Sequence, residues 1–274
     1  MVREITIGQY YYADSVIHKL DPRVKLMGTL IYVIGLFLIN NLLGYVFGGI
    51  ILLAVIALSK VPVKFITKGL KAVLIVLMIT VVLNLLLTPG IIVLRFWIFQ
   101  ISLEGIKTSV FMTLRLIMLI MGCSIMTLTT TPNNLTDGLE KALKPLQLIK
   151  IPVHEISMMM SIALRFIPIL LEETDKIMKA QSARGADFES GGVIKKAKSM
   201  VPLLVPLFVS AFRRANDLAM AMEVRCYRGG EGRTKMKPLR YSRRDYIGYL
   251  CILLFLVGII LLNNFGKLPF EYYF

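Results

Sequence analysis

The sequence contains few groups that could carry out chemistry: three cysteines, two histidines and one tryptophan among 274 residues. The cysteines have no paired spacing, and two of them lie within apolar runs, which argues against a disulfide framework or a zinc site. The ATP-binding pattern G-x-x-x-x-G-K-S/T is absent, and His154-Glu155 lacks the second histidine of a zinc protease. These absences predict a chain without a catalytic residue, a metal site or a cofactor. The cysteines are Cys123, Cys226 and Cys251.

Acidic residues are also scarce, whereas hydrophobic residues are abundant. Hydrophobic residues make up 56% of the chain, in runs that can cross a membrane, which indicates an integral membrane protein. The net charge of +15 arises from 32 lysines and arginines against 17 aspartates and glutamates. Because no nucleic-acid-binding motif is present, anionic lipid explains these cations better than a nucleic acid does. We therefore expect the lipid bilayer, and no nucleic acid, among the partners.

Five apolar segments are predicted to span the membrane. Asp21 followed by Pro22 is predicted to start the first helix, since aspartate caps a helix N-terminus and proline needs no donor at the first position. Arg23 and Lys25 are then expected at the lipid headgroups. Residues 91–103 are apolar but short, and we expect a re-entrant or surface segment there. The predicted spans are residues 26–39, 42–58, 72–87, 106–128 and 246–262.

The distribution of positive charge predicts the orientation. Residues 131–244 carry 20 of the 32 lysines and arginines, so we expect them in the cytoplasm. Five spans then give a cytoplasmic N-terminus and an external C-terminus. The chain is thus predicted to be an all-α integral membrane protein in three parts. These are an N-terminal membrane region of four spans and surface helices (1–130), a cytoplasmic domain with two long bent helices (131–244), and a C-terminal span with an external tail (245–274).

The first long helix is predicted at residues 153–182, which corresponds to roughly 45 Å of rod. Its apolar positions alternate spacings of four and three, as in a coiled-coil seam. Its charged residues lead us to exclude it as a lipid-facing span, and Pro168 is predicted to bend it. The seam comprises Ile156, Met160, Ala163, Ile167, Leu170, Thr174, Ile177 and Gln181.

The second long helix is predicted at residues 193–224. Two prolines are predicted to bend its early part. A stripe of alanines at intervals of four follows, and small side chains allow two helices to approach closely. A bent pair of helices that cross at small residues can slide, although the sequence does not require such motion. The prolines are Pro202 and Pro206, and the stripe comprises Ala211, Ala215 and Ala219.

Polar groups within the predicted spans are too few for a self-driven transporter, which usually binds its solute and coupling ion with such groups. The spans contain no aspartate or glutamate. Arg115 lies well inside the fourth span, where it could serve a function or simply contact a headgroup or a backbone carbonyl. We therefore expect the energy source and the solute site on other polypeptides. A self-contained permease, which would bind a solute, and a membrane enzyme, which would need a polar cluster at the headgroups, remain alternatives.

Five short motifs follow one another along almost the whole chain. They are HKLDPRVKL at 18–26, LRFIP at 164–168, AQSARG at 180–185, RRA at 213–215 and AMEVRCY at 221–227. In this order and with these spans, the chain resembles the transmembrane T component of energy-coupling factor (ECF) transporters, a group related to the cobalt-transport membrane subunit. The resemblance implies a non-catalytic scaffold in a prokaryotic cell membrane. Such a scaffold joins two ABC-type ATPases to a substrate-binding S component that takes up a vitamin or metal ion.

In that family, paired Ala-Arg-Gly motifs at the tips of two coupling helices dock into grooves of the two ATPases. The resemblance therefore implies ATPase docking by both tips of this chain. The second tip departs from the pattern, so we expect it to fit less closely. Considered alone, either arginine could be a solvated helix end beside its own C-terminal dipole. The tip residues are Ala183, Arg184 and Gly185 in the first helix and Val224, Arg225 and Cys226 in the second.

Overall fold

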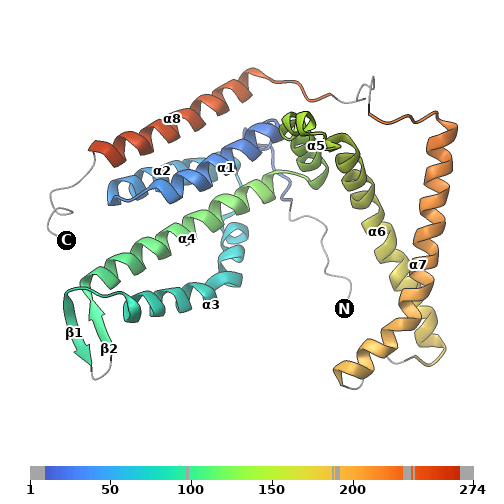
Figure 1. The fold of residues 1–274 in the computed structure, drawn as a ribbon, viewed down its shortest axis with the longest axis horizontal. Coiled ribbons are helices and arrows are strands. Elements are labelled where there is room, and N and C mark those ends of the chain that lie inside the picture. The colour runs from blue at the N-terminus through green and yellow to red at the C-terminus, as the bar shows by residue number, and fades with distance from the viewer. Residues whose placement is uncertain are drawn as a thin grey trace. The chain divides into compact units, whose positions relative to one another are not determined.

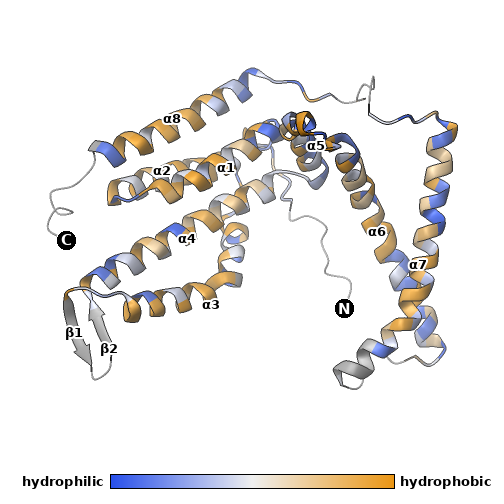
Figure 2. Ribbon diagram, in the orientation of Figure 1, coloured by the Kyte–Doolittle hydropathy of each residue, from blue (hydrophilic) through white to orange (hydrophobic). Residues whose placement is uncertain are grey.

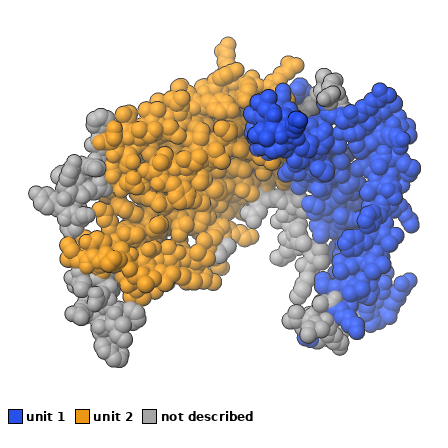
Figure 3. Space-filling view, in the orientation of Figure 1, with its two compact units in different colours: residues 1–7, 142–238 blue, residues 8–141, 239–274 orange. Residues whose placement is uncertain are grey.

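The chain divides into two compact units, which Figure 3 colours separately. The bundle unit comprises residues 8–141 and 239–274, and the long-helix unit comprises residues 1–7 and 142–238. The limits predicted from the sequence, at residues 131 and 244, remain predictions, and the predicted tail beyond residue 265 lies outside the described residues. The computed structural model describes residues 10–96, 99–186, 188, 192–230, 236 and 238–265.

The bundle unit consists of helices that follow the predicted apolar segments, together with one short hairpin (Figure 1). Helix α1 packs against α4 and α8, α2 packs against the same two helices, and α3 packs against α4. The helices and strands are α1 (Pro22–Leu38), α2 (Leu42–Ser59), α3 (Val63–Leu87), β1 (Ile92–Phe96), β2 (Phe99–Ser102), α4 (Leu103–Thr129), α5 (Pro132–Ala142) and α8 (Arg243–Phe265).

The bundle is apolar both inside and outside. Leu36 of α1, Tyr45 of α2 and Ile259 of α8 are almost completely buried in its core. The outward surfaces remain hydrophobic, as Figure 2 shows for α2, α3 and α8. Ile75 of α3, for example, is 71% exposed. A large exposed apolar surface is unfavourable in water, so this bundle is built to be surrounded by lipid.

Four described helices are long and apolar enough to cross a membrane, and α3 makes a fifth if its two halves form one span. Helix α3 bends by 59° between Val63–Lys71 and Val73–Leu87, so its lysine-rich start and its apolar part run in different directions. Helix α1, the first predicted span, has 17 residues and is not among these candidates. The prediction of an all-α membrane protein with about five spans is confirmed. The four candidates are α2, α4, α8 and the long-helix-unit helix α6 (Val153–Ala183).

The exclusion of α6 as a possible span was too strong. Its most apolar stretch contains at most two charged residues and has a mean hydropathy of 1.4. The charges that suggested exclusion, such as Glu172 and Lys176, lie in the later part of the helix. Composition therefore permits α6 to enter a membrane by its first part, although α6 also has a helix partner within its own unit.

The segment predicted to be re-entrant forms an antiparallel hairpin of β1 and β2, paired from Ile92 with Ser102 to Phe96 with Phe99. The hairpin leads directly into α4, because Ser102 accepts a hydrogen bond from the Gly105 amide at 2.9 Å and caps the helix. The Ser102 hydroxyl also donates to the Thr88 carbonyl at 2.7 Å, and this bond joins the C-terminal end of α3 to the start of α4. Pairing of the two strands satisfies the backbone groups on their facing edges without a helix.

The long-helix unit contains the short 3₁₀ helix η1 (Lys144–Ile149), α6 and α7 (Val193–Val224). Helices α6 and α7 pack against each other, and α6 also contacts η1. Pro168 lies inside α6, and Pro202 and Pro206 lie inside α7. Figure 1 shows α7 changing direction in its first part, where the two prolines remove backbone donors.

Candidate functional site

The candidate site is the pair of long helices, which contact each other through small and apolar side chains. Leu170 and Phe166 of α6 face the alanine stripe of α7 across a shallow apolar cavity of about 300 Å³. Ala211, Ala215 and Ala219 all line this cavity, together with Leu218 and Met222. Ala211 is partly buried, whereas Ala215 and Ala219 are exposed, so the short alanine side chains leave space between the helices.

The seam predicted along α6 is wrong for its first half. Ile156, Met160 and Ile167 are exposed, while Ile162 and Phe166 face α7 instead. The second half of the seam, from Leu170 to Gln181, is partly buried. A repeat of 3.5 residues describes two helices that lie alongside each other, whereas α7 crosses α6, so no single stripe remains in contact over the whole length (Figure 1).

One ion pair joins the two helices beside the apolar contact. The Arg214 Nη2 atom of α7 donates to the Glu173 Oε2 atom of α6 at 3.0 Å. Both side chains are partly exposed, at 37% and 27%, so the pair contributes at most about 1 kcal/mol. The pair marks where α6 and α7 meet at the crossing, and it adds little to the stability of that contact.

The first tip ends α6 with a Schellman motif. Arg184 is the C-cap, and Gly185 follows in the left-handed region with a φ of +89°. The Gly185 amide donates to the Ser182 carbonyl at 2.9 Å, and the Ala186 amide donates to the Gln181 carbonyl at 3.0 Å. No atom of the described residues lies within 4 Å of the position of a Cβ on Gly185, so glycine is favoured here by its conformation and not by space.

The second tip has the same backbone arrangement despite its different sequence. Arg225 is the C-cap of α7, and Cys226 adopts the left-handed conformation with a φ of +55°. The Cys226 amide donates to the Glu223 carbonyl at 2.8 Å, and the Tyr227 amide donates to the Met222 carbonyl at 3.0 Å. A left-handed residue other than glycine costs about 1–2 kcal/mol. The backbone of the second tip therefore matches that of the first, and the closeness of its fit to a partner stays a prediction.

The two tips present equivalent arginines at opposite ends of the helix pair. Figure 1 shows the end of α6 at the lower end of the pair and the end of α7 at its upper end. Arg184 and Arg225 are both exposed. Within the part of the chain that the structure describes, neither guanidinium has a hydrogen bond or an ion pair. Each arginine can therefore form a forked contact with a carboxylate of another molecule.

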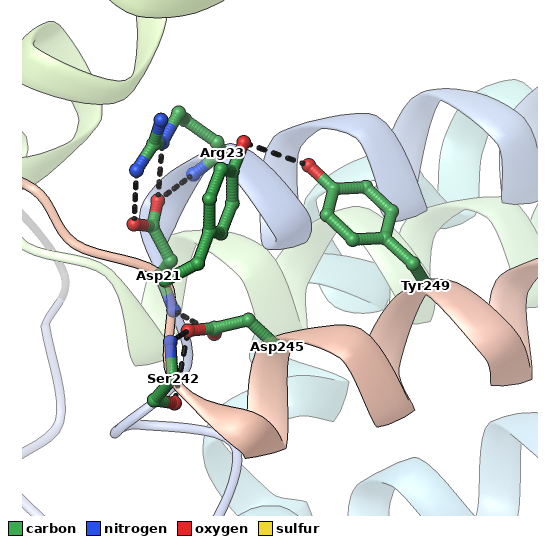
Figure 4. A network of polar contacts seen from close by, with 6 residues as sticks. Asp21, Arg23, Ser242, Asp245 and Tyr249 are labelled. Carbon is green, nitrogen blue, oxygen red and sulfur yellow. Dashed lines mark hydrogen bonds and ion pairs between the residues drawn. The ribbon is translucent and has the colours of Figure 1, made fainter.

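A buried polar network, which sequence reasoning missed, joins the starts of α1 and α8 (Figure 4). The Asp245 carboxylate is 2% exposed and accepts from the Asp21 amide at 2.8 Å. Its other oxygen accepts from the Ser242 amide at 2.7 Å and from the Ser242 hydroxyl at 2.9 Å. The bond from the Ser242 amide is one half of a capping box, in which the third helical residue reaches back to the N-cap. The other half is absent here, because the Asp245 amide donates to the Ser242 carbonyl at 3.0 Å and not to its hydroxyl. The only sequence signal was Ser-x-x-Asp before an apolar run.

Arg23 and Lys25, which were expected at the lipid headgroups, have acceptors within the bundle. Arg23 forms a forked ion pair with Asp21, and its guanidinium lies 3.9 Å from the centre of the Tyr241 ring. The Lys25 ammonium donates to the carbonyls of His18 and Thr129. The predicted N-cap role of Asp21 is confirmed, since its carboxylate accepts from the Arg23 amide. The motif around Asp21 thus ties the bundle together.

His18 fixes the loop that precedes α1. Its Nε2 atom lies 2.9 Å from the Tyr11 carbonyl oxygen, and its Nδ1 atom lies 2.7 Å from the Ser15 hydroxyl oxygen. Because a carbonyl only accepts, Nε2 carries the proton and Nδ1 accepts from Ser15. Burial lowers the pKa of His18, so the ring is neutral at pH 7 and both bonds persist.

Arg115 contacts a backbone carbonyl, one of the alternatives that the sequence left open. Its Nη2 atom donates to the Ile39 carbonyl at 3.1 Å, at the C-terminal end of α1. Its Nε atom donates to the Tyr45 hydroxyl at 3.0 Å. A cation that binds the free carbonyls of a helix end stabilises that end.

No group of three or more potential metal ligands occurs among the described residues.

Comparisons with known proteins identify the family of this chain. The CbiQ family, described as cobalt transport protein, matches residues 13–236. The energy-coupling factor transporter transmembrane protein EcfT of Clostridium kluyveri is 56% identical over 266 residues, which cover 96% of this chain and 98% of that protein. The protein of that name from Bacillus subtilis is 48% identical over 246 residues, covering 89% and 93%. The chain therefore belongs to the family that unites the CbiQ cobalt transport proteins with the transmembrane T components of energy-coupling factor transporters.

Proposed function

We propose that this membrane component couples ATP hydrolysis by two partner ATPases to the uptake of a vitamin or metal ion held by a separate S component. The observation that carries the proposal is the matched pair of tips, Arg184 and Arg225, with the same C-cap geometry at opposite ends of one helix pair. Two equivalent tips suit two related partners. Joining both partners through one helix pair would transmit the movement of the ATPases to the membrane.

The chemistry of the tips supports docking to an acidic groove. A guanidinium offers a rigid fork of donors that matches a carboxylate, which a lysine cannot copy. The Schellman motif holds each arginine at the last turn of its helix, so the side chain projects from a fixed backbone. Rigid presentation lowers the entropy that binding must overcome.

An exposed apolar face of α7 supports the proposal of a membrane-embedded partner, the S component. Val201, Val205, Phe208 and Phe212 recur at spacings of four, three and four, which places them on one side of the helix. Each is between 51% and 68% exposed. A hydrophobic helix face of this kind is suited to pack against the apolar surface of another membrane protein.

Purification from the native membrane tests the proposal directly. Tagged chain extracted in mild detergent should bring with it two ATPases and a small membrane protein, each identified by mass spectrometry. The isolated chain should neither hydrolyse ATP nor bind a vitamin with micromolar affinity in calorimetric titration. A chain that purifies without ATPases and binds a solute would instead be a self-contained permease, and the proposal would be wrong.

We further propose that the N-terminus and the long-helix unit are cytoplasmic and that the C-terminus is external, as the distribution of lysine and arginine indicates. A reporter fused after Phe274 should then be active only outside the cytoplasm. Cys226, which is exposed, should resist a membrane-impermeant maleimide added to intact cells, in a variant without Cys123 and Cys251. Reporter activity in the cytoplasm would mean an even number of crossings, as when α6 also spans the membrane.

A further inference from the structure

The bundle unit contains an apolar cavity of about 310 Å³ that plays no part in the proposed coupling. Its walls come from α1, α2, α4 and α8, and include Tyr32, Leu52, Ile125 and Phe255. This volume lies at the lower end of the range of about 300–1,000 Å³ found for ligand sites. The cavity is therefore large enough for part of a ligand, and its walls select an apolar one.

The charged groups of the cavity lining are all cationic. Lys25 and Arg244 are part of the lining, and no aspartate or glutamate is. Lys25 uses two of its three N–H groups on the carbonyls of His18 and Thr129, which leaves one donor. Arg244 is exposed and has no hydrogen bond or ion pair within the described part of the chain. The cavity thus combines apolar walls with free cationic donors.

The two cations lie at one end of the bundle. The lining there includes Lys25 near the start of α1, Leu58 near the end of α2, Thr129 at the end of α4 and Arg244 at the start of α8. The rim is exposed and apolar, since Leu58 is 53% exposed and Ile247 is 60% exposed. A rim of this kind opens toward lipid hydrocarbon, while helix ends lie at the headgroups.

We propose that this cavity is a binding site for an anionic glycerophospholipid. One acyl chain enters between α2 and α8 and lies against Tyr32 and Phe255. The phosphate contacts Arg244, with Lys25 as a second cation deeper in the site. Charge complementarity decides the class of ligand, because a zwitterionic lipid offers the same chains but adds a cation next to Arg244. A polar vitamin would leave most of its hydrogen-bonding groups without partners among these walls.

Photo-labelling in membranes of defined composition tests the site. The full chain is reconstituted in phosphatidylcholine vesicles that contain phosphatidylglycerol with a diazirine on one acyl chain. After irradiation, the label should concentrate on cavity-lining peptides, around Gly28–Tyr32 and Ile247–Ile252, relative to the lipid-exposed segment Leu74–Leu83 of α3. Phosphatidylcholine with the same photoactive chain should label the cavity peptides about fivefold less, the effect expected for one basic residue near a membrane.

Two matched pairs of variants separate the headgroup contact from chain occupancy. Arg244→Ala should lower phosphatidylglycerol labelling of the cavity about fivefold, whereas Arg243→Ala, which removes the same charge outside the lining, should leave it unchanged. Cys251→Trp should block the cavity for both lipids, whereas Leu250→Trp on the neighbouring exposed position should not.

The outcomes that would overturn the site are equally specific. Cavity labelling no greater than that of α3 would show general contact with the bilayer and no site. Equal losses in Arg244→Ala and Arg243→Ala would show a diffuse surface potential instead of a headgroup contact. Loss of labelling on addition of inorganic phosphate would mean that the cations bind free phosphate. If Cys251→Trp fails to fold, the arginine pair still decides, because both arginines are exposed.

Discussion

Reversing the charge of both tip arginines should release the partner ATPases from this chain almost completely. In the double variant, Arg184→Glu with Arg225→Glu, each tip would present a carboxylate to an acidic groove. Losing one member of a buried, hydrogen-bonded charge pair costs about 2–5 kcal/mol, and like charges add repulsion. Because two tips on one ATPase pair share avidity, either single variant should retain part of the binding that the double variant loses.

Co-purification of the ATPases with each variant measures this effect. Arg184→Lys should fall between wild type and Arg184→Glu, since lysine keeps the charge and loses the fork. The two single reversals should have similar effects, because both arginines are C-caps of the same Schellman motif. Lys179→Glu and Arg228→Glu are matched controls, since each reverses an exposed charge near one tip without touching a cap. If the double variant retains the ATPases at the wild-type level in membranes, the docking role is wrong.

The helices themselves were largely predictable, because the physics that sets their limits is local. The second span was predicted at 42–58 and α2 covers Leu42–Ser59. The second long helix was predicted at 193–224, the same limits as α7. Each signal that sets a helix limit lies in a short stretch of the chain. These signals are the apolar runs of membrane length, the lysine clusters at their ends and the Asp21-Pro22 start. Such signals can be recognised without knowing the fold.

What could not be predicted depends on contacts between distant residues. The face of α6 that meets α7 differs from the predicted seam at Ile162 and Phe166, because the crossing angle is not encoded in one helix. Residues 92–96 and 99–102 pair as two strands, although a short apolar run is equally compatible with a strand or a buried helix segment. The acceptors of Arg23 and Lys25 within the bundle could not be recognised in the linear sequence.

The tips show how a sequence departure can leave geometry unchanged. Cys226 replaces the glycine of the family motif, yet it adopts the left-handed conformation that Gly185 adopts in the first tip. The hydrogen bonds of the following residues to the last turn hold it there. Cysteine in place of glycine at position 226 therefore raises the conformational cost of the cap, while the backbone that carries Arg225 keeps the same geometry.

Removing the Asp245 carboxylate should destabilise the bundle unit by about 3 kcal/mol. Asp245→Ala leaves the buried Asp21 amide without its acceptor, which costs about 1–3 kcal/mol. It also removes the acceptor of the Ser242 amide and hydroxyl at the start of α8, which contributes about 0.5–2 kcal/mol. Ser242→Ala should have a smaller effect, because the Ser242 amide would still donate to Asp245 and the Asp21 contact would remain.

The measurement is the midpoint of SDS-induced unfolding in mixed micelles, followed by the helical circular-dichroism signal. Asp14→Ala is the matched control, because Asp14 forms an ion pair with Lys19 but has a side chain that is 76% exposed. Its removal should leave the midpoint almost unchanged. The network joins backbone positions 224 residues apart, so its loss should separate α8 from α1 before the remaining helices unfold. Equal midpoints for Asp245→Ala and Asp14→Ala would mean that apolar packing alone holds α8 in the bundle.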